Sequence, residues 1–292
     1  MTNRGTGVTS VGGGAQDAYR KPVTAARLYD YYLGGTHNFP ADREVAKALL
    51  ERTPMLRTIA RDNRAFLARA VRYLTSVGVH QFLDIGSGIP TEGNVHEIAQ
   101  AAVPGARVVY VDIDPDAVSE SLELLEGNRC ATAIRADVRE PRAILDHPQV
   151  RNLLDFGQPI AVLLVAVLHF VEDCDEVRDI VTTFRSALAP GSPLVVAHAT
   201  IDELIFDERL WEQTQKEYRE QTTTPLVPRK KRDVARFFDG FEMVEPGLVW
   251  LNTWRPDPDM VDEFKDKPEH SSIYVGVGRL PCADRPHRVI VD

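Results

Sequence analysis

The stretch that decides the fold is Phe82-Leu83-Asp84-Ile85-Gly86-Ser87-Gly88-Ile89-Pro90-Thr91. The apolar residues before Gly86 indicate the end of a buried strand. Gly86 and Gly88 permit a tight turn, and a helical pattern begins near Thr91. A strand, a glycine turn and a helix in this order bring backbone N–H groups and a helix N-terminus close to a ligand. The stretch therefore predicts a nucleotide-type site at the end of a strand.

Asp84 is the polar residue at the end of this strand, and it distinguishes between ligands of that type. An ionised carboxylate repels the pyrophosphate of a dinucleotide but attracts a ligand that carries an ammonium group. This favours a site for S-adenosylmethionine (SAM) over a site for NAD. The turn residues Gly86, Ser87 and Gly88 are predicted to contact the same ligand.

Composition and charge argue against several other classes of protein. The chain has 292 residues, of which 43% are hydrophobic, and its net charge is −9, as in a globular protein with a substantial core. Broad binding to nucleic acid relies on Lys and Arg and is not expected. The basic run 229–232 is predicted to be a solvated loop or a first helical turn. Neither the three cysteines nor the histidines have the spacing of metal ligands.

No segment of the sequence is expected to enter a membrane. The longest apolar stretch, residues 160–171, is interrupted by His169 and is too short to span a bilayer. The N-terminus has no basic region followed by an apolar core, so no signal peptide is expected. We therefore predict a cytoplasmic protein without a membrane partner.

The chain is predicted to divide into four segments: a flexible tail (1–20), an N-terminal helical cap (21–80), a Rossmann-like α/β domain (81–279) and a C-terminal tail (280–292). Helices of the cap are expected over 22–33, 41–53 and 54–77. In the next segment strands alternate with helices, which predicts a mostly parallel sheet with helices on both faces.

Strands of this sheet are expected over 81–85, 107–112, 132–136, 160–168 and 193–198. Helices between them are expected over 91–102, 115–126, a short stretch after 141, and 175–188. A polar helix over 201–220 and a short helix over 233–238 then precede two late strands, 241–251 and 272–278. These late strands are predicted to form an antiparallel hairpin at the edge of the sheet.

Acidic residues follow the second and third strands as well as the first. Asp112 is placed to accept hydrogen bonds from a ribose diol, and Ile113 to offer an apolar surface to adenine. Capping of the next helix is the alternative role for Asp112. Asp137 is predicted to accept from the adenine amino group, and the Val138 N–H to donate to a ring nitrogen. Together with Asp84, these carboxylates meet at the edge where α/β sheets bind ligands.

The end of the fourth strand is expected beside the reactive end of the ligand, where Ala166 is a predicted contact. His169 is the candidate catalytic residue, which orients a nucleophile or acts as a general base. A histidine hydrogen-bonded to the backbone is the alternative, and His198 has the same two interpretations. Tyr32 and His37 of the cap are the other catalytic candidates.

The cap supplies further predicted contacts. Arg64 is the first candidate to pair with a ligand carboxylate and Arg27 the second, and surface salt bridges are the alternative for both. Asn38 is also predicted to contact the cofactor. Tyr29 and Tyr32 are three residues apart on one helix face, so they either pack on the core or line a cavity.

The set Asp84-x-Gly86-x-Gly88, Asp112 and Asp137-Val138 resembles the class I SAM-dependent methyltransferases. Residues 26–39 are similar to the N-terminal signature of a narrower, actinobacterial SAM-dependent methyltransferase family, formerly classed as a domain of unknown function. Further matches lie at 63–67, 82–94, 163–170 and 244–248, and the resemblance spans about 22–279. Pro90 stands where many class I members have a third glycine, in agreement with the narrower family.

The resemblance implies a seven-stranded sheet whose last strand is antiparallel, and SAM as the cofactor with its methionine end near Asp84 and Gly86. We therefore predict a SAM-dependent methyltransferase that acts on a small-molecule acceptor by in-line displacement. Such transfer needs mainly alignment and desolvation of the nucleophile. A SAM-binding sensor or partner-binding protein without catalysis is the alternative, and a NAD-dependent oxidoreductase is a third interpretation.

Overall fold

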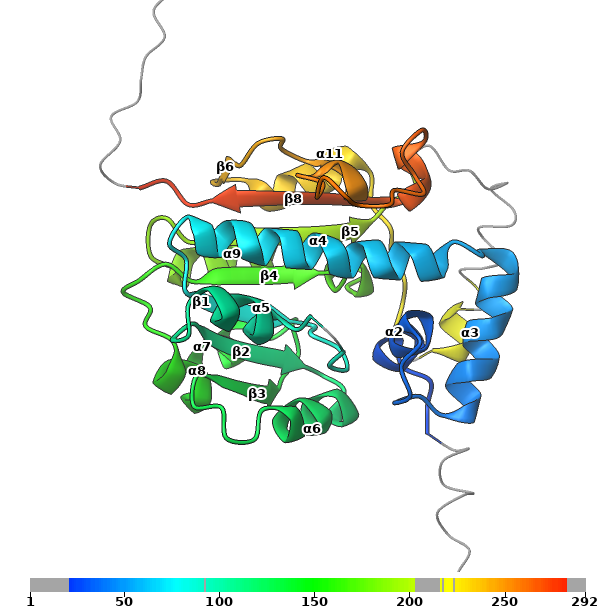
Figure 1. Ribbon diagram of the computed structural model, residues 1–292, viewed down its shortest axis with the longest axis horizontal. Coiled ribbons are helices and arrows are strands. Elements are labelled where there is room, and N and C mark those ends of the chain that lie inside the picture. Colours follow the sequence, from blue (N-terminus) through cyan, green and yellow to red (C-terminus); the bar gives the residue numbers. More distant parts are fainter. Residues whose placement is uncertain (1–20, 92, 203–215, 217, 223, 283–292) are drawn as a thin grey trace, which may run out of the picture.

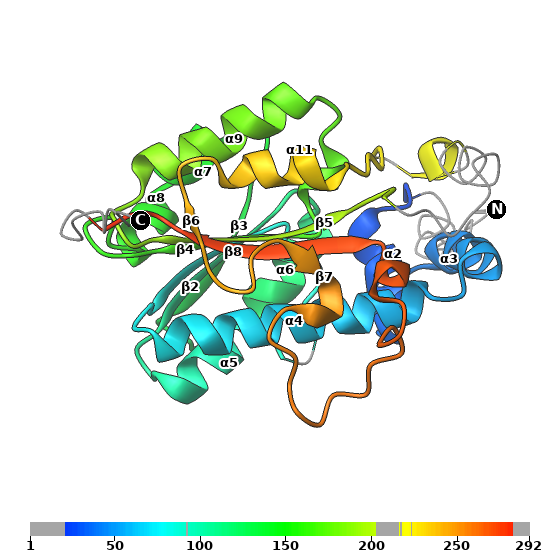
Figure 2. The ribbon, with the colours of Figure 1, turned by 90° about the horizontal axis from the view of Figure 1, so that it is seen from above.

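The computed structural model describes residues 21–91, 93–202, 216, 218–222 and 224–282. The predicted N-terminal tail, most of the predicted helix over 201–220 and most of the predicted C-terminal tail lie outside the described residues. A central sheet carries helices on both faces (Figures 1 and 2), which confirms the predicted α/β class. No helix within the described ranges has both the length and the apolar character that crossing a bilayer requires.

The sheet has eight strands in the order β3-β2-β1-β4-β5-β8-β6, and β7 pairs with β8 outside this path. β1 to β5 are parallel, and β8 runs antiparallel between β5 and the short strands β6 and β7. The strands are β1 (Gln81–Ile85), β2 (Arg107–Asp112), β3 (Ala131–Arg135), β4 (Ala161–Val165), β5 (Pro193–Ala199), β6 (Glu242–Met243), β7 (Val249–Trp250) and β8 (Ile273–Arg279).

The eighth strand arises because the strand predicted over 241–251 is divided into β6 and β7. Between them, the Gly247 N–H donates to the Val244 carbonyl at 2.9 Å and closes a turn. Gly247 has a φ of +88°, a left-handed conformation that strands do not contain. The expected antiparallel pairing of the late strands is nevertheless present, because both pieces pair with β8.

Side chains of the parallel strands fill two cores, one on each face of the sheet. In β1, Phe82 belongs to one core and Leu83 and Ile85 belong to the other. Because both faces are covered, the strands read as nearly continuous apolar runs. Asp84 points to the same face as Phe82 but lies at the carboxyl end of the strand.

Two groups of helices cover the faces. One face carries α4 (Leu56–Ser76), α5 (Val95–Ala102) and α6 (Pro115–Leu124); the other carries α7 (Pro141–Asp146), α8 (Pro148–Leu153), α9 (Cys174–Ala187) and α11 (Lys231–Ala235). Figure 2 shows α4 and α5 on one side of the sheet and α9 and α11 on the other. The α4 core includes Phe66, whose ring meets Trp254 edge-on with 5.5 Å between centroids.

The helices α2 (Ala25–Leu33) and α3 (Pro40–Arg52) lie beyond the carboxyl ends of the parallel strands (Figure 1). α2 ends as predicted at Gly34, which has a φ of +83°. α3 begins at Pro40, and the Asp42 carboxylate accepts a hydrogen bond from the Phe39 N–H at 2.8 Å. The third predicted helix, α4, starts beside them and continues along the sheet.

Glycines on β8 allow helical residues to pack directly on the sheet. A Cβ atom on Gly278 would lie 2.8 Å from Phe238 and Phe241, and one on Gly276 would lie 3.1 Å from Phe238. The opposite face of the same strand carries Val275 and Val277, which are fully buried in the α4 core.

Three predicted boundaries and one predicted exposure are wrong. α2 begins at Ala25 rather than at residue 22, because Thr24 caps the helix and accepts the Arg27 N–H. α5 begins at Val95 rather than at residue 91, because Asn94 starts the helix and its N–H donates to Glu97 at 2.8 Å. β4 ends at Val165 rather than at residue 168. There Ala166 adopts a φ of +60° and a 3-10 turn, Leu168–Phe170, follows.

The predicted exposure concerns Arg229, which is buried rather than solvated. Its guanidinium donates to the carbonyls of Leu168 at 3.1 Å, Val171 at 2.7 Å and Glu172 at 3.1 Å. The Leu168 carbonyl also accepts the Val171 N–H, which closes the 3-10 turn, whereas Val171 and Glu172 follow the turn. The rest of the basic run forms the first turn of α11, as one of the two predicted interpretations had it.

We expect Phe66→Ala to lower the free energy of unfolding by about 3–5 kcal/mol, because it removes a fully buried ring and leaves a cavity. Urea denaturation followed by circular dichroism measures the change. Val261→Ala is the matched control, since Val261 is 85% exposed. A loss below roughly 1 kcal/mol for Phe66→Ala would show that this contact does not hold α4 to the sheet.

Candidate functional site

A cavity of about 640 Å³ lies along the carboxyl ends of the parallel strands. The loops after β1 to β4 form one wall, and α2 with the first turns of α4 forms the other. Its size is in the range that holds a cofactor or a drug-sized ligand. The cavity brings together all but one of the predicted cofactor contacts: Asp84, Gly86, Ser87, Gly88, Asp112, Ile113, Asp137, Val138, Ala166 and Arg64.

Asn38 is the predicted contact that does not line the cavity. Its amide donates to the Asp30 carboxylate at 2.7 Å and to the Gly35 carbonyl at 2.9 Å. Asn38 therefore holds the turn between α2 and α3 instead of reaching a ligand. His37 is also outside the cavity, because its ring lies 3.2 Å from Glu120 at the surface.

The glycine turn after β1 leaves no room for side chains where it meets β4. Gly86 has a φ of +72°, and a Cβ atom there would lie 2.5 Å from Val167. Gly88 also has a positive φ, and the space beside it is open. The turn thus exposes its backbone to the cavity, as the sequence predicted for a ligand that approaches closely.

Asp112 joins this turn to the end of β2. One carboxylate oxygen accepts the Gly88 N–H at 2.7 Å, and the other accepts the Asp114 N–H at 2.9 Å. Burial raises the pKa of Asp112, and the two N–H donors oppose the shift. The helix cap is supplied by Asp114, which accepts the Asp116 N–H, so Asp112 is not needed for the capping role.

Asp84 is a buried carboxylate without a hydrogen-bond donor. It is only 4% exposed, and none of the described residues donates a hydrogen bond to it. Burial raises its pKa to about 7; Arg64 lowers it and Asp112 adds to the rise. An unpaired buried carboxylate is costly, so this position suits a cationic ligand group.

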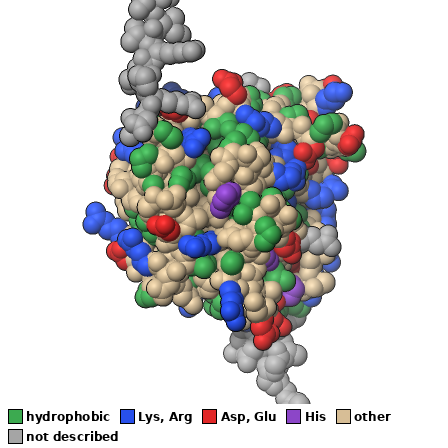
Figure 3. Space-filling model, turned by 60° about the vertical axis from the view of Figure 1, so that its left-hand side comes forward, with side chains coloured by type: hydrophobic (Ala, Val, Ile, Leu, Met, Phe, Trp, Pro, Cys, Tyr) green, Lys and Arg blue, Asp and Glu red, His purple; other side chains and the backbone are tan. Residues whose placement is uncertain are grey.

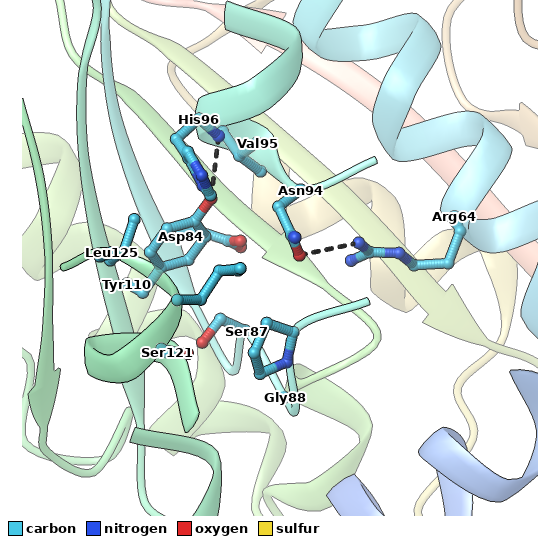
Figure 4. A pocket seen from close by; sticks show the side chains of 12 residues that line it. Arg64, Asp84, Ser87, Gly88, Asn94, Val95, His96, Tyr110, Ser121 and Leu125 are labelled. Carbon is cyan, nitrogen blue, oxygen red and sulfur yellow. Dashed lines mark hydrogen bonds between the residues drawn. The ribbon is translucent and has the colours of Figure 1, made fainter. Parts of the chain in front are cut away.

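A small second space lies behind Asp84 (Figure 4) and holds at most one water-sized molecule. Among its lining residues, Arg64 donates to Asn94 Oδ1 at 3.4 Å, and the His96 N–H donates to the Tyr110 hydroxyl at 2.8 Å. Neither Tyr110 nor Asn94 was predicted from the sequence as a site residue. Tyr110 precedes Asp112 by two residues, so the period of a strand could have placed both on one face.

The predicted adenine contacts differ in exposure. Ile113 is 47% exposed, which leaves an apolar side chain open toward the cavity. Burial alone would raise the pKa of Asp137, but hydrogen bonds from the side chain and backbone of Arg139 hold it below its usual value. Asp137 is therefore an ionised acceptor, as its predicted role requires.

His169 lines the cavity from the 3-10 turn and not from the end of β4. Its Nδ1 accepts the Ala199 N–H at 3.3 Å. Burial, with Arg229 nearby, lowers the pKa of His169 to about 3. The ring is neutral at pH 7 with its proton on Nε2, so it offers no lone pair for a general base. These contacts are those of the alternative interpretation, a histidine hydrogen-bonded to the backbone.

Arg27 lines the cavity but is occupied by carboxylates. It lies 2.9 Å from Asp42, 3.3 Å from Asp114 and 3.2 Å from Asp116. Its side chain is only 3% exposed, so these are not the surface salt bridges considered as the alternative. Arg27 instead ties α2 and α3 to the start of α6.

The predicted tyrosines both line the cavity. The Tyr29 hydroxyl donates to the Ala60 carbonyl at 2.9 Å and accepts from Asn63 at 3.0 Å. Tyr32 also packs against the cluster of apolar side chains between α2 and α3. The two interpretations of these residues, core and cavity wall, are therefore both realised.

A parallel sheet with a glycine turn after its first strand, and carboxylates at the ends of the next strands, is the arrangement of a nucleotide-binding α/β fold, and the class I SAM-dependent methyltransferases share it. A family model described as S-adenosyl methyltransferase matches residues 16–281. The chain belongs to this family, and it is a SAM-dependent methyltransferase with SAM as its cofactor. The resemblance found in the sequence is thereby confirmed, and the interpretation as a NAD-dependent oxidoreductase is not supported.

Two crystal structures from actinobacteria are similar over nearly their whole length. A candidate methyltransferase from Thermobifida fusca is 40% identical, with a TM-score of 0.83 over 92% of this chain and 98% of that chain. A DUF574-family protein from Streptomyces avermitilis is 37% identical, with a TM-score of 0.82 over 89% of this chain and 98% of that chain. No curated protein matches the sequence.

We expect the His169 ring to remain neutral, and its NMR resonances to stay constant, between about pH 5 and pH 8, because its pKa is depressed. A pH series of ¹H–¹⁵N spectra, assigned with His169→Gln, measures this. A titration midpoint near about pH 6.5 would contradict the hydrogen-bonded, buried arrangement and reopen the role of general base.

Proposed function

We propose that this methyltransferase binds SAM in the cavity at the strand ends and methylates a small organic molecule by in-line displacement. The observation that carries the proposal is the Asp84 carboxylate, buried at the end of β1 without a donor among the described residues. An ammonium group is the partner that such a carboxylate requires. This matches the methionine end of SAM.

The other proposed cofactor contacts follow the same chemistry. Arg64 is positioned to pair with the methionine carboxylate, and the backbone of Gly86 and Gly88 borders the same region. Asp112 is the proposed partner of the ribose hydroxyls. The remaining proposed contacts are Ser87, Ala166, and around the adenine Ile113, Asp137 and Val138. When bound, SAM supplies an activated sulfonium methyl group.

Because the methyl group of SAM is already activated, the protein has mainly to exclude water and to align the acceptor. α2 and the first turns of α4 border the cavity opposite the strand ends and support this role. His169 is proposed to shape the cavity near the acceptor rather than to remove a proton, since its Nδ1 is occupied.

A small acceptor is favoured over a nucleic acid by the distribution of charge. The chain has a net charge of −9, and on the face drawn in Figure 3 acidic and basic side chains are interspersed. Nucleic-acid binding depends on an extended positive surface. The size of the cavity likewise supports a small organic molecule.

We expect the affinity for SAM to rise with pH up to about 7, because Asp84 must release its proton before it faces the ammonium group. Below that pH the dissociation constant should increase by up to about tenfold per unit. Calorimetry with SAM and with S-adenosylhomocysteine across this range measures the effect. Asp84→Asn should weaken binding at pH 8 and abolish the dependence, whereas Asp146→Asn, on the exposed side of α7, should change neither. A wild-type affinity that is constant with pH would contradict the role of Asp84.

Asp112→Ala should weaken SAM binding by about 1–3 kcal/mol, the usual cost of losing hydrogen bonds to a charged partner. The control is Asp146→Ala, whose side chain is 74% exposed and, among the residues with described positions, pairs with Arg151. Calorimetry gives the affinities, and circular dichroism verifies that the variant is folded. An unchanged affinity would remove Asp112 from the proposed site.

A further inference from the structure

One part of the cavity differs in chemistry from the cofactor contacts. Its lining includes Tyr32, Leu56, Ile59, Leu67, Phe170 and Ile273, and we call these residues the acceptor compartment. Three of them lie on α4 at helical spacing and so share one face of that helix. The acidic residues that line the cavity lie at the ends of β1 and β2, in the loops after β2 and β3, and in the first turn of α6. Arg64, the α4 arginine that lines the cavity, extends toward Asn94 (Figure 4).

Most hydrogen-bonding side chains next to this compartment are already occupied. The Tyr29 hydroxyl is held by Ala60 and Asn63, and His169 Nδ1 is held by the Ala199 N–H. Tyr32 is different, because its hydroxyl makes no hydrogen bond to any residue that the structure describes. Asn63 Oδ1 and Thr224 Oγ1 also line the cavity without a hydrogen-bond partner among the described residues. Tyr32 is the residue that brings a hydroxyl group into the acceptor compartment itself.

The compartment also favours the neutral form of each ionisable group beside it. Burial raises the pKa of Tyr29 and Tyr32, although the positive charges of Arg64 and Arg57 oppose the shift. Burial lowers the pKa of His169 to about 3. The same desolvation acts on a bound acceptor. It keeps a phenol protonated and poorly nucleophilic, and it keeps an amine neutral with its lone pair available.

We propose that the acceptor is an uncharged, largely apolar primary or secondary amine that is methylated on nitrogen, with Tyr32 accepting a hydrogen bond from its N–H. The inference rests on the proposed function of the cavity. The nitrogen lone pair forms the new bond to the methyl carbon while the carbon–sulfur bond breaks, and its electron pair passes to sulfur. The sulfonium becomes a neutral thioether, and the ammonium formed on the acceptor releases its proton to water. No described residue has to act as a base.

Matched pairs of probes that share one carbon skeleton test the chemistry of the acceptor. The full-length protein is incubated with methyl-tritiated SAM and with one probe at a time. The three pairs of probes are aniline and phenol, naphthylamine and naphthol, and 5-aminoindane and 5-indanol. The expected result is labelling of the amines at least about tenfold faster than of the corresponding phenols. Mass spectrometry then identifies the nitrogen as the methylated atom.

Each other outcome has a distinct meaning. Phenols labelled as fast as amines would overturn the assignment of nitrogen. No labelling of any probe, with SAM binding intact by calorimetry, would overturn this acceptor class but not the proposed cofactor site. Absence of SAM binding would instead overturn the proposed function itself.

Tyr32→Phe tests the hydrogen bond to the acceptor. It should lower kcat/KM for the best amine by about three- to tenfold, the effect of one neutral hydrogen bond, with unchanged SAM affinity. Tyr31→Phe is the matched control, because Tyr31 lies on the same helix, stacks against Arg57 and does not line the cavity. Equal kcat/KM values for the two variants would remove Tyr32 from acceptor binding.

Discussion

The hydrogen bond between the Gly88 N–H and the Asp112 carboxylate is the contact on which the site depends. It fixes the turn after β1 against the end of β2 at 2.7 Å. The turn also packs directly against Val167, which follows β4. This is possible because Gly86 has no side chain that would collide with Val167. With the turn held there, its backbone and the Asp84 carboxylate border the same cavity. A local conformation that only glycine adopts without strain is thus held at the cavity by a carboxylate and by the Val111 carbonyl of the neighbouring strand.

The two halves of the cavity have opposite chemistry because they are built from different elements. Strand ends cannot bury their last backbone and side-chain polar groups in the apolar layers, so the carboxylates gather at the edge of the sheet. α4 faces this edge with an apolar stripe, which lines the cavity at Leu56 and Ile59 and contributes Phe66 to the core. One amphipathic helix therefore provides both the wall of the acceptor compartment and the attachment of that wall to the sheet.

Features encoded within a few consecutive residues could be predicted from the sequence. The apolar strands, the glycine turn, and the meeting of Asp84 and Asp112 at one edge follow from local periodicity and from the rule for parallel sheets. Tertiary contacts decided the features that the sequence did not reveal. His169 lies in a turn because Ala166 adopts a positive φ, and Arg229 is buried because carbonyls distant in sequence need donors. No local sequence pattern predicts either the turn that contains His169 or the burial of Arg229.

The glycines of β8 affect the position of Ile273, the residue at the start of this strand that lines the cavity. Gly276 and Gly278 face the Phe238 ring, and the intervening positions carry valine. Shifting the strand by one residue would press a branched side chain into that ring, so only one alignment with β5 avoids a collision. The same alignment sets where Ile273, the first residue of β8, meets the cavity. The position of Ile273 in the cavity wall is thus linked, through the register of β8, to two glycines farther along the same strand.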